Sequence, residues 1–113
     1  MTSEALRWSV VIPYFNERDY LPATLASLYT QDMRAFRLIL VDNASTDGSG
    51  ALAREIAAAH PDIETVHAFE AQPGKIHALA HGQELVTTPY VAFCDADTVY
   101  PPHYLRRCEE LLQ

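Results

Sequence analysis

The sequence predicts an α/β fold, with a Rossmann-like, mostly parallel sheet of strand order 3-2-1-4 and helices on both faces. Short apolar runs alternate with amphipathic stretches of helical length, a pattern typical of right-handed βαβ crossovers. The mostly apolar run YVAFC leads directly into a pair of aspartates, as expected where a buried strand leaves a sheet. Because no linker, repeat or low-complexity tract interrupts the alternation, we expect residues 1–113 to form one domain.

The chain is predicted to begin with a strand and a helix. Residues 8–12 (WSVVI) form an apolar run, and Pro13 ends it because proline has no N–H to donate to a ladder. In the helix that follows, Asp19 is a candidate N-cap and Pro22 lies in the first turn. The apolar face of this helix carries Leu21, Leu25 and Leu28.

A second strand and helix follow with the same logic. Residues 36–41 (FRLILV) predict a strand that delivers Asp42 at its end. The polar loop NASTDGSG comes next, and within it Asp47 or Ser49 can cap an Ala-rich helix over residues 51–60. The small side chains of that helix indicate close packing on a sheet.

The C-terminal half repeats the alternation. Residues 63–67 (IETVH) predict a weaker strand near a sheet edge, and residues 75–86 predict a helix. Residues 90–94 (YVAFC) are expected to form a strand buried on both faces. Pro101 or Pro102 then opens a last helix. Its apolar stripe comprises Tyr104, Leu105, Cys108, Leu111 and Leu112.

Composition excludes several classes of function. The net charge is -7 and no Lys/Arg run is present, which argues against a nucleic-acid binder and against a polybasic membrane-binding surface. No apolar run approaches the roughly 20 residues that span a bilayer, so we expect no membrane segment. Cys94 and Cys108 lie in apolar patterns and indicate a reducing compartment. The expected location is cytoplasmic, or the inner face of the membrane in a longer protein.

Polar residues follow the predicted strands where a ligand would bind. In an open parallel sheet of this order, the crevice lies beyond the carboxyl ends of the first and fourth strands. Residues 13–17, Asp42, Asp95 and Asp97 all arrive there. Adjacent carboxylates repel each other, and a hard divalent ion that also binds substrate phosphates would neutralise them. We therefore expect Mn²⁺ or Mg²⁺ at Asp95 and Asp97.

Several of these residues also have simpler explanations. A DxD motif alone is close to chance in a chain with this many aspartates, and Asp42 is also a common turn residue. Tyr14 and Phe15 either stack on a base or fill the edge of the sheet. Lys75 stands at a helix start, where a cation opposes the helix dipole, which favours a phosphate partner.

The motifs VVIPYFNE, LVDNASTDGS, PGK before a helix, and FCDADT occur in that order along the chain. Together they resemble the nucleotide-sugar-binding half of family 2 glycosyltransferases, which have the GT-A fold. The resemblance implies an inverting, metal-dependent, hexosyltransferase-like enzyme that takes its sugar from a nucleotide diphospho-sugar, UDP-sugars being favoured. The acceptor stays unknown. The resemblance also implies that the acceptor-binding half and the general base lie beyond residue 113, so this chain would be truncated and inactive alone.

The resemblance further implies which residues bind the donor. Asp42 would hydrogen-bond the base, Lys75 would lie near the phosphates, Asp95 near the ribose and sugar, and Asp97 closer to the metal. The full set is Pro13, Tyr14, Asn16, Glu17, Asp42, Lys75, Asp95 and Asp97. The run GKIHALAHG departs from the family, because Ala80 replaces a frequent asparagine. The alternative hypothesis is a non-catalytic domain of the same fold that binds a nucleotide sugar or a protein partner.

Overall fold

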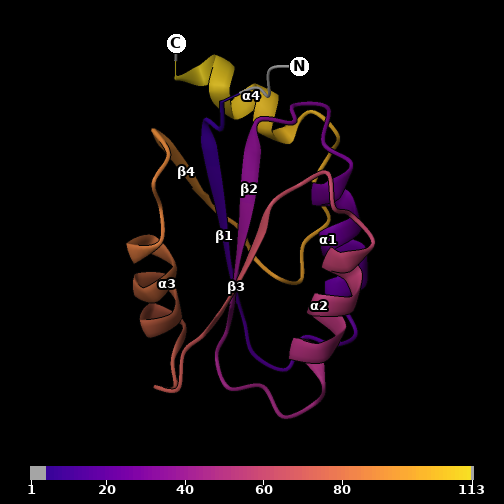
Figure 1. Ribbon diagram of the computed structural model, residues 1–113, viewed down its shortest axis with the longest axis vertical. Helices are drawn as coiled ribbons and strands as arrows, with labels where there is room; N and C mark the ends of the chain where they lie inside the picture. The colour runs from indigo at the N-terminus through magenta and orange to yellow at the C-terminus, as the bar shows by residue number, and fades with distance from the viewer. Residues whose placement is uncertain (1–4, 113) are drawn as a thin grey trace.

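The computed structural model describes residues 5–112, in which strands and helices alternate along the chain (Figure 1). The elements are β1 (Trp8–Tyr14), α1 (Leu21–Tyr29), β2 (Phe36–Asp42), α2 (Ser49–Ala58), β3 (Thr65–Phe69), α3 (Lys75–Glu84), β4 (Tyr90–Phe93) and α4 (Tyr104–Leu111). All strand pairs are parallel and the order is β3-β2-β1-β4, which confirms the predicted sheet. Every strand therefore directs its carboxyl end to the same edge of the sheet.

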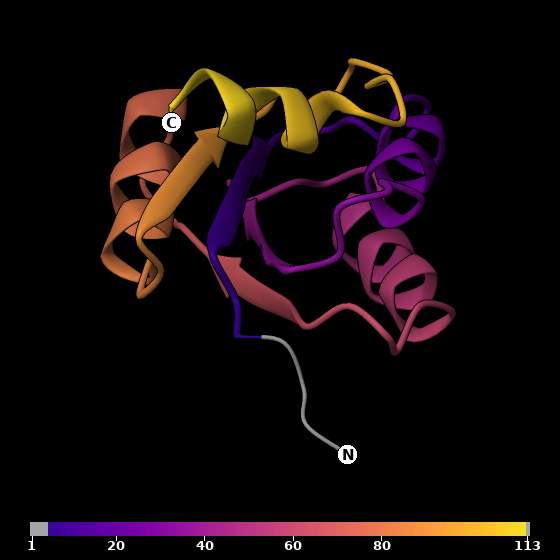
Figure 2. The same cartoon turned by 90° about the horizontal axis from the view of Figure 1, so that it is seen from above.

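Helices cover both faces of this sheet, as predicted. Figure 2 shows α1 and α2 together on one side and α3 on the other, with α4 lying across one end. The larger core lies under α1 and α2 and includes Leu25, Leu38 and Leu40, all fully buried. The smaller core lies under α3 and is built on Val11 and Ile39. The larger core extends to Tyr14, the last residue of β1, and to Ala96, just beyond β4.

The first strand runs two residues further than predicted. Pro13 lies inside β1 and pairs in register with Val41 of β2. The Tyr14 carbonyl accepts a hydrogen bond from Asn43 on the β2 side, and the Val11 carbonyl accepts one from Cys94 on the β4 side. Because alternate residues of a parallel strand face alternate neighbours, Pro13 faces the β4 side, where pairing has already ended at Val11. Its missing N–H therefore costs no ladder bond.

The fourth strand is not buried on both faces, contrary to the sequence prediction. β4 is an edge strand, and its side chains alternate between buried and exposed. Ala92 points into the larger core, whereas Val91 and Phe93, on the opposite face of the strand, are exposed. A run of apolar residues identifies a strand, but its place in the sheet depends on which other segments cover it.

Boundaries and caps also differ in detail. Tyr20, not Asp19, is the N-cap of α1, and Gly48 is the N-cap of α2. The Asp47 carboxylate nevertheless accepts a hydrogen bond from the Ser49 N–H at 2.9 Å, so it does satisfy a donor at this helix start. The third strand begins two residues later than predicted and lies at the sheet edge, as expected.

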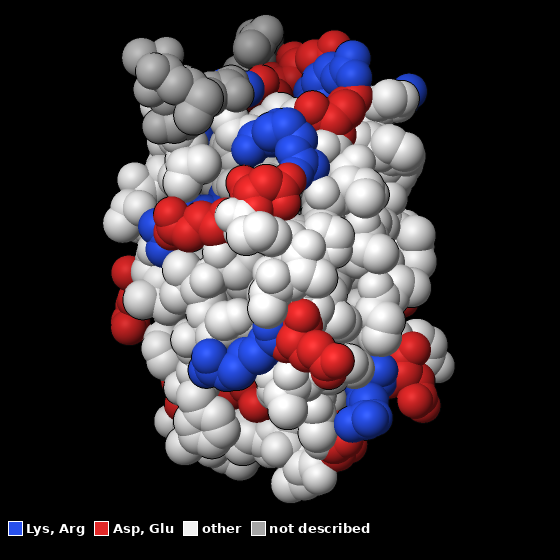
Figure 3. Space-filling view, turned by 45° about the vertical axis from the view of Figure 1, so that its right-hand side comes forward, with Lys and Arg blue, Asp and Glu red and all other residues white. Residues whose placement is uncertain are grey.

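Surface charge and helix length bear on the expectations of no basic binding surface and no membrane segment. On the face shown in Figure 3, Lys and Arg side chains alternate with Asp and Glu, and the described residues of that face form no continuous basic surface. Within residues 5–112, each helix is too short or too polar to cross a bilayer.

Candidate functional site

A cavity of about 470 Å³ opens at the carboxyl ends of β1 and β4. It is lined by Pro13, Tyr14, Phe15, Glu17, Asn43, Lys75, Asp95, Ala96 and Asp97. The structure thus brings together all the predicted site residues except Asn16 and Asp42. Phe15, with 56% of its surface exposed, lies at the cavity and does not fill the sheet edge. Its ring is available to a ligand.

The turn that carries Asp95 and Asp97 is held from behind. The buried Thr24 hydroxyl of α1 donates to the Ala96 carbonyl at 3.0 Å, and the Asp95 N–H donates to the Tyr100 hydroxyl at 2.8 Å. Burial raises the pKa of Tyr100 to about 12, so this hydroxyl stays neutral. Ala96 is buried while the aspartates on either side are exposed. The turn therefore directs its backbone inward and leaves both carboxylates available.

Lys75 reaches across the cavity to the first of these carboxylates. Its Nζ lies 2.7 Å from Asp95 Oδ1, and more than half of each side chain is exposed. The two residues come from α3 and from the turn after β4, elements that the fold places on either side of the open edge. The cation predicted to meet a phosphate thus contacts a carboxylate of the same cavity.

Glu17 adds a third acidic group to the cavity. Its backbone N–H donates to the Ser49 hydroxyl at 3.1 Å, which fixes the loop after β1 against the start of α2. Burial raises the pKa of Glu17 first, and the negative charges of Asp97 and Asp47 raise it further. Of these two charges, Asp97 belongs to the cavity, so Glu17 and Asp97 repel each other there.

Asn16 and Asp42 support the loops instead of lining the cavity. The Asn16 amide oxygen accepts a hydrogen bond from the Thr46 N–H at 2.8 Å, with Asn16 itself at φ 51°. Asparagine tolerates this left-handed backbone better than most residues. Asp42 Oδ1 accepts one from the Ser45 N–H at 2.8 Å. In this structure both side chains hold the loop after β2, and their predicted contacts with a nucleotide stay predictions.

Asn43, which the sequence places at a strand end without assigning it a contact, lines the cavity. It is buried, and its amide donates to the carbonyls of Glu70 and Gln72 at 3.0 and 2.8 Å. Its Oδ1 accepts a hydrogen bond from the Gly74 N–H at 3.1 Å. One side chain therefore holds the whole loop that leads into Lys75. A buried-strand end reading Asp-Asn was the available signal, but only the loop's position reveals the role.

Replacing Asn43 by alanine is expected to destabilise this loop. The change removes three part-buried hydrogen bonds, to the carbonyls of Glu70 and Gln72 and from the Gly74 N–H, which typically costs about 1–3 kcal/mol in the free energy of unfolding. Urea denaturation followed by circular dichroism measures that loss. Gln72→Ala is the matched control, because the Gln72 side chain is exposed and only its backbone carbonyl meets Asn43. Equal stability of Asn43→Ala and the wild type would contradict the assignment.

The acidic residues suit a divalent cation that arrives with its own oxygen ligands. Asp95, Asp97 and Glu17 offer carboxylate oxygens, the ligands that hard cations prefer. Among the residues the structure describes, however, no three His, Cys, Asp or Glu side chains gather closely enough to form a metal site alone. Mg²⁺ and Mn²⁺ are commonly held by one or two carboxylates together with substrate phosphates. The cavity fits that second arrangement.

Comparison with known proteins is consistent with this geometry. Residues 9–113 match the model of glycosyl transferase family 2. The chain is 36% identical over 105 residues to the uncharacterized glycosyltransferase YibD of Escherichia coli, covering 92% of this chain and 30% of that protein. It is 30% identical over 104 residues to the putative teichuronic acid biosynthesis glycosyltransferase TuaG of Bacillus subtilis, covering 92% of this chain and 41% of that protein.

Solved structures share the fold. A mannosyltransferase from Pyrobaculum calidifontis, in complex with GDP-Man and Mn²⁺, matches with a TM-score of 0.90 and 32% identity, over 97% of this chain and 33% of that one. TarS from S. aureus, in complex with UDP-GlcNAc, matches with a TM-score of 0.82 and 21% identity, over 95% and 31%. Both confirm the GT-A type of fold. The chain spans about a third of the length of these solved relatives.

Proposed function

This chain belongs to glycosyl transferase family 2, and on that premise we propose that it is the donor-binding half of a metal-dependent, inverting glycosyltransferase. One observation carries the proposal: the strand ends and α3 bring Glu17, Lys75, Asp95 and Asp97 around one cavity. A nucleotide diphospho-sugar complements that set, because its diphosphate binds a cation and its base can stack on an aromatic ring. We take the domain to comprise residues 1–113.

The chemistry of each cavity residue suggests its role in binding the donor. Asp95 and Asp97 would hold Mn²⁺ or Mg²⁺, and a bound divalent ion supplies Lewis-acid stabilisation of charge on the leaving diphosphate. Phe15 presents an exposed ring at the end of β1, suited to a nucleotide base, whereas the neighbouring Tyr14 is buried in the larger core. Tyr14 stays protonated, since burial and the nearby Asp42 charge raise its pKa. These groups bind and orient a donor.

Transfer of the sugar also requires a general base that removes the proton of the acceptor hydroxyl, and we do not assign that role to a residue of this cavity. Glu109 is engaged at the other end of the sheet, where its carboxylate accepts hydrogen bonds from Arg7 and Trp8. Of the cavity carboxylates, Asp95 and Asp97 are assigned above to the metal. We therefore assign acceptor binding and the base to the part of a family 2 enzyme that this chain does not span, and transfer by the chain alone is expected to be undetectable.

Which nucleotide base the cavity accepts is a separate question from whether it binds a diphosphate. The family resemblance favours UDP-sugars, whereas the solved relative at 32% identity is in complex with GDP-Man. Phe15 offers the cavity an exposed aromatic ring, and an aromatic ring stacks on any nucleotide base. Both nucleotides must therefore be titrated.

Calorimetry tests the proposal directly. We expect UDP or GDP to bind with Mn²⁺ present and to bind at least about tenfold more weakly with EDTA, because the metal neutralises the repulsion between diphosphate and carboxylates. AMP serves as the control, since a monophosphate lacks the second phosphate that would complete the metal's ligands. If neither UDP nor GDP binds in the presence of Mn²⁺ or Mg²⁺, the proposed function is wrong.

A further inference from the structure

We propose that Lys75 serves as an internal counter-cation for Asp95 before the donor binds, and that it exchanges this carboxylate for the diphosphate when metal and nucleotide arrive together. The inference rests on the proposed function and concerns the order in which charges are paired at that site. The structure contains the pair itself, with Lys75 Nζ 2.7 Å from Asp95 Oδ1. The Lys75 ammonium group thus contacts a carboxylate oxygen of Asp95 that a divalent ion would also bind.

The position of Lys75 is built into the fold. Asn43 holds the loop before α3 by its contacts with Glu70, Gln72 and Gly74. Gly74, directly before Lys75, has φ 121°, a backbone conformation that residues other than glycine rarely adopt. A buried clamp and a glycine turn thus start α3 at this lysine. The lysine is held over the cavity although a cation at a helix N-terminus is unfavourable.

The strength of the pair suits an exchangeable contact. Side-chain exposure is 63% for Lys75 and 56% for Asp95. Ion pairs this exposed contribute little to folding, because water and salt screen them and both side chains lose freedom. A diphosphate offers more negative charge than one carboxylate, and a divalent ion offers Asp95 more positive charge than one ammonium group. If metal and nucleotide bind together, Lys75 therefore gains a more strongly charged partner in the diphosphate, and Asp95 gains one in the divalent ion.

This exchange predicts opposite effects on two ligands. Mn²⁺ alone competes with Lys75 for Asp95, whereas Mn²⁺ with a nucleotide gains Lys75 as a phosphate contact. Lys75→Met should therefore bind Mn²⁺ alone about two- to fivefold more tightly, the range expected for losing an exposed ion pair. The same variant should bind Mn²⁺ with UDP or GDP about tenfold more weakly, as expected for losing a charged hydrogen bond.

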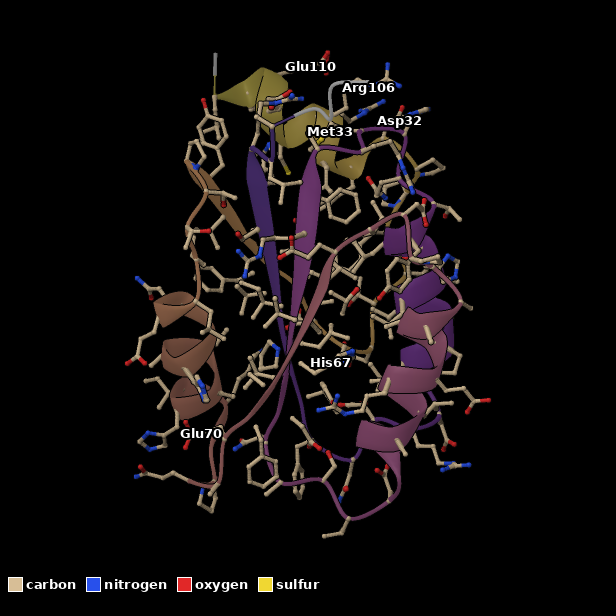
Figure 4. The ribbon with its side chains drawn as sticks, in the orientation of Figure 1. Asp32, Met33, His67, Glu70, Arg106 and Glu110 are labelled. Atoms are coloured by element: carbon tan, nitrogen blue, oxygen red, sulfur yellow. The ribbon has the colours of Figure 1, made fainter. Side chains whose placement is uncertain are left out.

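The experiment measures free Mn²⁺ by electron paramagnetic resonance, with and without nucleotide, for the wild type and Lys75→Met. Arg106→Met is the matched control: it removes one positive charge and breaks an ion pair with Asp32. Figure 4 shows Asp32 and Arg106 beside α4, at the opposite end of the sheet from Glu70, which belongs to the loop before Lys75. Arg106→Met is expected to change neither affinity.

A second comparison separates the direct pair from a general effect of charge. In an Asp95→Asn background, Lys75→Met should no longer tighten Mn²⁺ binding, because the competing pair is already gone. Equal tightening in both backgrounds, or no tightening in either, would overturn the inference. The ¹⁵N resonance of the Lys75 ammonium group, which should move upon Asp95→Asn and upon saturation with Mg²⁺, reports on the pair where Mn²⁺ binding is weak, and an unmoved signal overturns the inference. Absence of nucleotide binding by the wild type would instead contradict the proposed function.

Discussion

Replacing Asp97 by asparagine is expected to abolish the metal dependence of nucleotide binding while leaving the fold intact. Asp97 is exposed at the cavity, so the change removes a charge without creating a void. Loss of a side chain that merely supports a metal ligand costs about 10–100-fold in metal affinity, and loss of a ligand should cost at least as much. Calorimetric titration of UDP and GDP, each with Mn²⁺ and with EDTA, measures the effect.

The control for Asp97→Asn is Glu110→Gln, which removes the same charge from an exposed position on α4 (Figure 4). It should bind nucleotide and metal like the wild type. The thermal unfolding of Asp97→Asn should match or slightly exceed that of the wild type, because Asp97 repels Glu17 and raises the pKa of that carboxyl. Retained Mn²⁺-dependent binding by Asp97→Asn would contradict the assignment of this residue to the metal.

The fold was largely predictable because its signals are local. Alternating apolar runs and amphipathic helices predict the parallel sheet, and the polar strand ends predict its open edge. Pro13 was misjudged because a proline interrupts a strand only on the side that its nitrogen faces, and that side depends on a neighbour distant in the sequence. Val91 and Phe93 were placed in a core for the same reason, since their burial depends on what lies beside β4.

The candidate site was predictable in its position but less so in its contacts. Glu17, Asp95 and Asp97 follow directly from the strand ends, and the cavity contains them. Asn16 resembles a ligand contact in the sequence, yet its amide bridges two loops of the fold. The pairing of Lys75 with Asp95 joins residues on separate elements, so no local pattern indicates it. Side chains that act across loops become visible only once the loops are placed.

The last helix provides the largest expected effect on stability. The sequence predicted an apolar stripe, but Leu105 is the one side chain of α4 that is fully buried, at 0% exposure. It belongs to the larger core, and its backbone N–H donates to the buried Gln31 side chain at 3.0 Å. Leu105→Ala should therefore lower the free energy of unfolding by about 2–5 kcal/mol, the range for a buried leucine.

Leu111→Ala is the matched control, because Leu111 lies on the same helix and is 85% exposed. Its unfolding free energy should stay within about 0.5 kcal/mol of the wild type in urea denaturation. Since α4 lies across the amino end of the sheet, folded Leu105→Ala should still bind nucleotide with Mn²⁺ at the opposite edge. Equal destabilisation by the two substitutions would show that the whole apolar stripe is buried in solution, and would contradict the packing of α4 through Leu105.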